Sequence, residues 1–260
     1  MPFLGKQPAE AALVTGDLGD DIVTEAKVAN DAIGLTELKA GTDGEIISWD
    51  ASGDPVAIGV GASGHFLKSQ GAGSQPVFAA AGGAWNVIGT SVASSSASLT
   101  ITGLDSTYDT YAIAVSDAHP ATDGVAGWLR LGDSSGIDSG ASDYGWGQLG
   151  LAINNTAIAL IGSEDSSDAQ IDITSASDAD VGNAASEGMG GLYFLHAPGD
   201  GAIRSIITGQ TTYINESGAF FGFSVFGGMT SVITLDRVSF LFSSGNIASG
   251  RLTVWGLAHA

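Results

Sequence analysis

The sequence contains no cysteine, and this absence excludes disulfide bonds, thiolate catalysis and cysteine-ligated zinc. Basic residues are also scarce, since 8 Lys and Arg stand against 28 Asp and Glu, for a net charge of −20. Such an acidic surface repels phosphate backbones and anionic lipids, so we expect no nucleic-acid partner and no membrane insertion. No apolar run approaches the roughly 20 residues of a membrane-spanning helix, and the first residues lack the basic and apolar parts of a signal peptide.

The abundant residues divide the chain into regions of different composition. Glycine occurs 39 times, and hydrophobic residues make up 44% of the chain, which is enough to fill a core. The small residues Ala80-Ala81-Gly82-Gly83 indicate a flexible joint. Every Lys precedes this joint, whereas every Arg and four of the five Trp follow it. We therefore divide the chain into an N-terminal segment at 1–40, a hairpin-repeat stalk at 41–82 and a head domain at 83–260.

The stalk contains a repeated hairpin pattern. The stretch at 41–47 (GTDGEII) with its tail at 53–56 (GDPV) is echoed by 61–67 (GASGHFL) with its tail at 73–77 (GSQPV). Each copy places a short apolar strand, a Gly/Ser turn and a second strand in order, which predicts a β-hairpin. One hairpin is marginally stable in water, so repeated copies must stack on each other or on other chains.

Residues 20–39 are open to two interpretations. Thr24-Glu-Ala-Lys27 returns as Thr36-Glu-Leu-Lys39, each after apolar residues, which favours a continuation of the repeats. Alternatively, Ile22, Ala26, Ala29 and Ile33 have the 4-3-4 spacing of a helix that is too short to be stable alone. Both interpretations require partner chains.

The head has the pattern of many short strands separated by Gly-, Asn- and Ser-rich turns. Leu99-Thr-Ile101 and Ile171-Asp-Ile173 alternate between apolar and polar residues, as strands with one buried face do. We predict a mainly β fold, with a β-sandwich head for which a jelly roll is the favoured topology. The predicted strands are 85–89, 97–102, 110–115, 128–131, 149–153, 157–161, 170–173, 192–195, 203–207, 219–226, 232–235, 238–242 and 251–256.

Motifs that carry chemistry are largely missing. The four His have no zinc-site spacing, no G-x-S-x-G elbow occurs, and the match to G-x-G-x-x-G at Gly59 to Gly64 precedes no predicted helix. The acidic pairs at 133/138, 164/165 and 178/180 lie in Ser/Gly-rich segments that predict solvated turns. Calcium is conceivable at 165–180, but the spacing is generic and no ligand set follows from it. We expect no enzyme, no catalytic residue, no metal and no cofactor.

Aromatic residues provide the best candidates for contact with a ligand. Tyr144 and Trp146 lie in a Ser- and Gly-flanked stretch that predicts a loop, and exposed rings would offer stacking faces to sugars or anchors to proteins. The alternative is that both rings fold back onto the sandwich or pack at a subunit interface. Trp85, Trp128 and Trp255 lie in strand patterns, which predicts core positions.

The chain resembles tail fibres and other virion appendages of tailed bacteriophages. The resemblance is carried by residues 16–27 (GDLGDDIVTEAK), 41–56 (GTDGEIISWDASGDPV), 64–69, 75–78, 97–124 and the closing stretch at 250–258 (GRLTVWGLA). It implies a homotrimeric virion protein, assembled in the host cytoplasm, in which 1–40 anchors the chain to other virion proteins. The head of a tail fibre or spike would bind a host surface glycan or protein. A capsid-attached head fibre or decoration protein is the alternative, and a fibre-borne polysaccharide depolymerase is a third possibility.

A homotrimer would also solve the problem that the stalk presents. Its isolated apolar residues cannot offset the conformational entropy of about 1–2 kcal/mol per residue in a single chain, whereas three chains can bury them against each other. The stalk residues that we expect to meet across the trimer axis are Ile22, Val23, Ile33, Leu35, Leu38, Ile46, Ile47, Phe66 and Leu67.

Overall fold

The computed structural model describes residues 24, 28, 40–80, 82–154, 157–174 and 180–258. Two compact units are present, Met1–Ala81 and Gly82–Ala260. All regular elements among the described residues are strands, which confirms the predicted mainly β fold. The 20–39 alternatives, most of the predicted anchoring segment and the stalk contacts Ile22, Val23, Ile33, Leu35 and Leu38 lie outside the described residues.

The first unit contains two small hairpins, as the repeats predict. Strand β1 (Ile46–Trp49) pairs with β2 (Pro55–Ile58), and β3 (His65–Lys68) pairs with β4 (Val77–Ala80), both antiparallel. The Asp50 carboxylate closes the first turn by accepting hydrogen bonds from the backbone N–H of Ser52 and Asp54 at 2.8 and 3.0 Å. Ile58 is the one buried hydrophobic residue in the described part of this unit. The hairpins therefore have almost no core of their own.

The second unit contains thirteen strands in its described residues. They are β5 (Trp85–Val92), β6 (Leu99–Thr102), β7 (Thr110–Pro120), β8 (Gly127–Asp133), β9 (Gly136–Ile137), β10 (Tyr144–Asn154), β11 (Ala157–Asp168), β12 (Ile171–Asp172), β13 (Gly188–His196), β14 (Ile206–Ile214), β15 (Phe220–Met229), β16 (Arg237–Phe242) and β17 (Ile247–Leu257).

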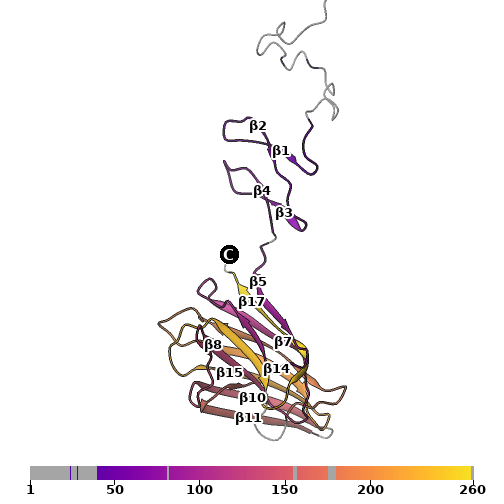
Figure 1. Cartoon of the computed structure of the whole chain (residues 1–260), viewed down its shortest axis with the longest axis vertical. Coiled ribbons are helices and arrows are strands. Elements are labelled where there is room, and N and C mark those ends of the chain that lie inside the picture. The colour runs from indigo at the N-terminus through magenta and orange to yellow at the C-terminus, as the bar shows by residue number, and fades with distance from the viewer. Residues whose placement is uncertain are drawn as a thin grey trace, which may run out of the picture. The chain divides into compact units, whose positions relative to one another are not determined.

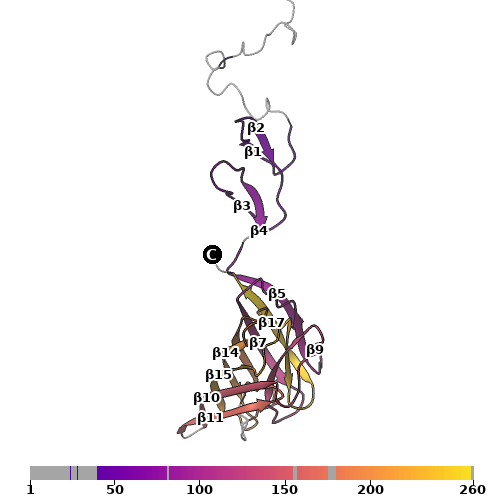
Figure 2. The ribbon, with the colours of Figure 1, turned by 90° about the vertical axis from the view of Figure 1, so that its left-hand side faces the viewer.

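These strands form two antiparallel sheets. The larger has eight strands in the order β11-β10-β15-β14-β13-β7-β17-β5 (Figure 1). The smaller has the order β12-β8-β16-β6, and the short β9, labelled in Figure 2, pairs with β8. The chain crosses between the sheets repeatedly, because β6, β8, β12 and β16 belong to the smaller sheet and the strands next to them in sequence belong mainly to the larger.

One hydrophobic core joins the two sheets. Tyr111, Ile113 and Tyr193 enter it from the larger sheet, and Leu129 and Phe240 enter it from the smaller; none of the five is exposed. Strand alternation selects these residues, since successive side chains of a strand point to opposite faces. In β6, for example, the alternating sequence LTIT has alternating buried and exposed positions, as predicted.

Several details differ from the sequence prediction. Residues 232–235 form no strand, β14 begins at Ile206 rather than at 203, and β11 continues to Asp168 through an acidic stretch that has the composition of a turn. Trp85, Trp128 and Trp255 are also not core residues, since Trp85 is exposed and the other two are only partly buried. Trp85 is 44% exposed, and its ring contacts those of Trp255 and Phe194 at 5.7 and 6.2 Å between centroids.

A buried polar group lies within the head. The Asp172 carboxylate accepts a hydrogen bond from the Thr174 N–H at 2.9 Å, and the Thr174 hydroxyl accepts one from the Gly127 N–H at 2.9 Å. The Gln148 side-chain amide donates to the Thr174 carbonyl. Burial raises the pKa of Asp172 from 3.8 to about 7, against the opposing effect of the Thr174 hydrogen bonds, and the charge of Asp180 adds to the rise.

We predict that Asp172 makes the head less stable as the pH rises. A carboxyl whose pKa is higher in the folded state binds its proton more tightly there, so its stabilising effect is complete below pH 3.8 and is lost as the pH rises through about 7. Across this window the loss approaches roughly 4 kcal/mol, at 1.36 kcal/mol per pKa unit. In Asp172→Asn this fall should disappear, as measured by urea unfolding at several pH values. The exposed control Asp54→Asn should retain it, and equal pH dependence in Asp172→Asn and the wild type would contradict the assignment.

Candidate functional site

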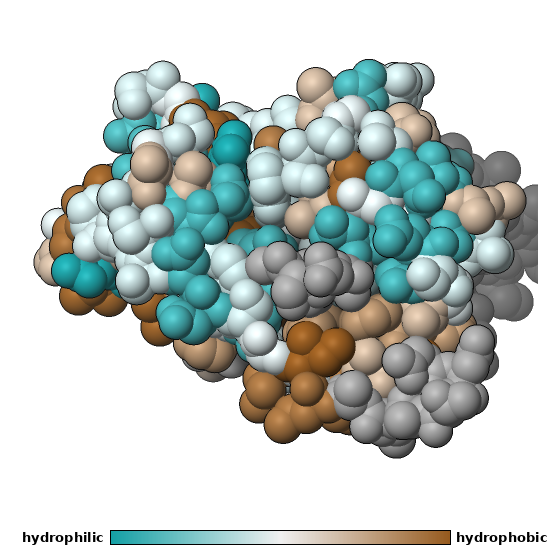
Figure 3. Space-filling model, turned by 90° about the horizontal axis from the view of Figure 1, so that it is seen from below, coloured by the Kyte–Doolittle hydropathy of each residue, from teal (hydrophilic) through white to brown (hydrophobic). Residues whose placement is uncertain are grey.

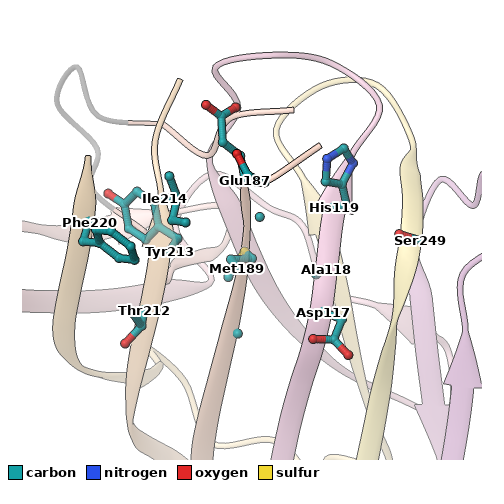
Figure 4. A pocket seen from close by; sticks show the side chains of 13 residues that line it. Asp117, Ala118, His119, Glu187, Met189, Thr212, Tyr213, Ile214, Phe220 and Ser249 are labelled. Carbon is teal, nitrogen blue, oxygen red and sulfur yellow. The ribbon is translucent and has the colours of Figure 1, made fainter. Parts of the chain in front are cut away.

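A groove of about 430 Å³ lies in the second unit where the ends of five strands of the larger sheet meet. Asp117 and His119 of β7 lie on one side of β13, and Thr212 of β14 and Phe220 of β15 lie on the other (Figure 4). Gly188 and Gly190 of β13 form the floor between them. The floor has no large side chains, so a ligand can approach the backbone closely.

Backbone irregularities position the charged side of the groove. The pairing of β7 with β17 shifts register on both sides of Ser249, and the pairing of β7 with β13 shifts between Met189 and Gly191. Asp117 has a φ of 50°, a left-handed conformation that Asp tolerates better than most residues. A side chain on Gly250 of β17 would come within 2.7 Å of the Ala118 backbone, so the close approach of β17 to β7 needs a glycine there.

The rim of the groove is held by hydrogen bonds to the backbone. The His119 Nε2 atom lies 3.0 Å from the Ala184 carbonyl, so the ring donates its proton there. The Ala184 N–H in turn donates to the Glu187 carboxylate at 2.7 Å. These two bonds tie the turn around Ala184 to the end of β7. His119 and Glu187 therefore have a structural task in addition to facing the groove.

The side chains of the groove can bind a polar ligand. Among the described hydrogen bonds, none joins His119 to Asp117 or Ser249, so the groove does not show the contacts of a Ser-His-Asp triad. The Asp117 carboxylate and the hydroxyls of Thr212 and Ser249 can exchange hydrogen bonds with a polar ligand. Phe220, 54% exposed, adds an aromatic surface on the opposite side. The combination fits a small hydroxyl-bearing ligand.

The structure places Tyr144 and Trp146 in the interior, which agrees with the alternative that both rings fold back onto the sandwich. Both residues belong to β10 rather than to a loop, and they are 0% and 7% exposed. The Tyr144 hydroxyl accepts a hydrogen bond from the Leu131 N–H at 2.8 Å and faces the carbonyl oxygens of Leu131 and Asp138 at 2.8 and 2.9 Å. Trp146 donates its indole N–H to the Asp168 carboxylate at 2.9 Å. Neither ring offers the exposed stacking face on which the prediction depended.

The remaining acidic candidates have different surroundings. Hydrogen bonds from Ser135 lower the pKa of Asp133, whereas burial raises that of Asp138. Glu164 and Asp165 lie in β11, not in the predicted turn, and Asp178 lies outside the described residues.

The described residues contain neither a cluster of metal ligands nor a membrane-spanning helix. No group of three or more His, Asp or Glu there is arranged to hold a metal ion. No helix in that part of the chain has the length and hydrophobicity that crossing a membrane requires.

Sequence reasoning did not find the groove, although parts of it carry recognisable signals. Asp117 and His119 stand before Pro120 at the end of a predicted strand, and Gly188 to Gly191 is a glycine-rich stretch. The sequence does not reveal that β7, β13, β14 and β15 are neighbours, because three of these four strands are separated from β7 by 68 or more residues. The site is a product of sheet order.

Comparison with known proteins provides no assignment. No protein-family model, no curated protein and no solved structure matches this chain. Any statement of function therefore depends on the residues and on the geometry described above.

We predict that Tyr144→Phe destabilises the head by about 1–3 kcal/mol, since the buried Leu131 N–H would lose its partner. Urea unfolding at constant pH measures this difference. Tyr108→Phe is the matched control, because the half-buried Tyr108 hydroxyl makes no hydrogen bond among the described residues. An equal effect of both substitutions would show that the Tyr144 hydroxyl does not hold the 131–138 segment.

Proposed function

We propose that this protein is a structural component of a phage virion, a homotrimeric tail fibre or spike. Residues 1–82 would join the three copies and attach them to other virion proteins, and the head would bind the host surface. The sequence resemblance is the reason for proposing a virion protein and for proposing three copies. The proposal includes no enzymatic activity and no cofactor.

The observation that carries the proposal is the exposure of apolar side chains on both hairpins. Ile46, Ile47, Trp49, Phe66 and Leu67 are 38%, 59%, 63%, 63% and 48% exposed. Hairpins of this size are marginal alone, and here they bury a single hydrophobic residue in their described part. Burial against other copies, at about 25 cal/mol per Å², would supply the missing stabilisation. A second copy of the chain carries the same exposed apolar residues, so the two copies can bury these residues against each other.

We further propose that the head is a jelly roll with two added hairpins. Eight strands in the orders β5-β17-β7-β13 and β6-β16-β8-β12 follow the double Greek-key arrangement of that fold. The hairpin β10–β11 and the pair β14–β15 extend the first of these sheets. Jelly rolls occur in both viral capsid and lectin domains, so the topology is compatible with a structural and a binding role.

The groove is the feature of the head that best supports host-surface binding. It combines the Asp117 carboxylate, the hydroxyls of Thr212 and Ser249 and the exposed ring of Phe220 around a glycine floor. Such a set recognises hydroxyl-rich groups through hydrogen bonds and stacking. A surface saccharide is the ligand class that this chemistry favours.

We predict that light scattering gives three times the chain mass of 26.0 kDa for the intact protein. The double substitution of Ile46 and Ile47 by Asp should release 26 kDa monomers, because it places charge on the apolar faces that meet. The control Ala51→Asp with Ala72→Asp adds the same charge at exposed turn positions and should remain trimeric. A monomer mass for the unmodified protein at micromolar concentration would overturn the proposal.

We predict that Asp117→Asn weakens saccharide binding by roughly tenfold, the effect of losing one or two hydrogen bonds to a charged acceptor. Asn keeps the size and tolerates the left-handed conformation at this position. The measurement is a bacterial glycan array followed by titration of the strongest spot. Asp54→Asn makes the same change in the first unit and should bind as the wild type does. Unchanged binding by Asp117→Asn would exclude the groove.

A further inference from the structure

One face of the larger sheet has no formal charge over four adjacent strands. The side chains that alternate away from the core form rows across β10, β15, β14 and β13, set by the pairing register. The rows contain no Asp, Glu, Lys or Arg. Read from β10 to β13, the five rows are Gly145, Gly228, Ile206 and His196; Gly147, Phe226, Thr208 and Phe194; Leu149, Ser224, Gln210 and Leu192; Leu151, Gly222, Thr212 and Gly190; and Ile153, Phe220, Ile214 and Gly188. We call these residues the outer face.

The part of the outer face near the sheet edge is strongly apolar. Leu149, Leu151 and Ile153 follow each other on β10 and are 54%, 49% and 57% exposed. Leu160 of the edge strand β11 pairs with Leu151 and is 72% exposed, and Phe220 of β15 pairs with Ile153 and is 54% exposed. Hydrophobic residues also gather along one border of the surface when the molecule is viewed from below (Figure 3). These five residues form a continuous apolar patch.

Charge argues that the partner of this face is another copy of the chain. Each copy carries a net charge of −20, so two copies repel each other wherever their acidic loops and turns approach. The outer face has no formal charge of its own, and on the neighbouring edge strand β11 the charged Glu164 pairs with Gly147, away from Leu151 and Ile153. A positively charged partner would gain nothing from an uncharged surface, whereas an acidic one requires it. Large contiguous apolar patches on a protein surface mark interaction sites.

Size and shape fit the same partner. Three strands (β11, β10 and β15) spaced about 4.8 Å apart, each ten or more residues long at about 3.4 Å per residue, give a flat area of roughly 500 Å² before side-chain relief is counted. A standard interface buries about 800 Å² per partner. A hollow of about 500 Å³ lies beside Gly222, between Leu149, Leu151 and the strand β14. Phe226, 59% exposed on the same face, is a side chain that could fill such a hollow in a neighbouring copy.

We propose that the heads of neighbouring copies pack on each other through the part of the outer face on β10 and β15, together with Leu160 of β11, which leaves Thr212 of β14 and the glycine floor on β13 to the groove. The apolar patch on β10, β11 and β15 would lie at the centre of this contact. The inference extends the proposed homotrimer, on which it rests for the number of copies, and adds a second contact to the one in residues 1–82.

The absence of native cysteine makes a direct test possible. Ser224→Cys places one thiol in the middle row of the outer face, beside Leu149, and Ser134→Cys places one in the exposed turn between β8 and β9. The full-length proteins are treated with a thiol reagent, and their masses are measured in parallel. We expect Cys at position 224 to react at least about tenfold more slowly than Cys at position 134, because the thiol is reached only when the contact opens.

A second pair of variants separates this contact from the one in the hairpins. Leu151→Lys, added to Ser224→Cys, should restore rapid reaction, whereas Val232→Lys, at an exposed position off the outer face, should leave the thiol protected. Circular dichroism checks that both variants remain folded. A trimeric mass with a fast-reacting thiol at 224 would overturn the head contact and leave the proposed function intact.

The two remaining outcomes separate the proposals further. A monomeric mass with a fast-reacting thiol would overturn both the homotrimer and the head contact. If the Ile46 and Ile47 double Asp variant stayed associated with a protected thiol at 224, the head contact would be supported and the hairpin contact would not.

Discussion

The fold of the second unit depends on a sheet that has two faces and only one core. Alternation along each strand sends Tyr193, Phe223 and Val225 into the core and leaves Leu192, Ser224 and Phe226 on the opposite face. The smaller sheet supplies Leu129 and Phe240 to the same core. Since the register is fixed by these buried residues, it also fixes which residues form the outer face and which meet in the groove. A shift by one residue in any strand would exchange the two sets.

Buried hydroxyl and indole groups explain how large rings occur among Ser and Gly. Tyr111 bonds through its hydroxyl to the backbone of Asp105, and Tyr144 does the same for Leu131 and Asp138, so each ring holds a turn against the core. Burial raises the pKa of Tyr111 to about 12, so this hydroxyl stays protonated and keeps its bonds at physiological pH. Small neighbours are needed for this close approach. The Ser and Gly residues around Tyr144 are therefore typical of a loop, although Tyr144 itself is buried in the core.

Local patterns in the sequence predict the local structure and fail where distant strands meet. Alternation in 99–102 and the repeats in 41–77 correctly predict a strand and two hairpins, because short-range burial and turn chemistry determine them. The acidic end of β11 was missed, since its strand conformation comes from pairing with β10 rather than from its own propensity. Pairings such as β10 with β15 and β7 with β13 join residues far apart in the sequence. The groove depends on such pairings, so no local pattern predicts it.

Assembly and binding would be linked at Phe220 in the proposed trimer. This residue belongs to the apolar patch through its pairing with Ile153, and it also forms one side of the groove opposite Asp117. A neighbouring copy on β10 and β15 would therefore lie against the Phe220 side of the groove and leave the glycine floor and the β7 side, with Asp117 and His119, to the ligand. The distribution of charge fits this division, because the two acidic residues of the groove, Asp117 and Glu187, lie outside the uncharged rows. The apolar part of the sheet would then hold the copies together, and its polar edge would bind the ligand.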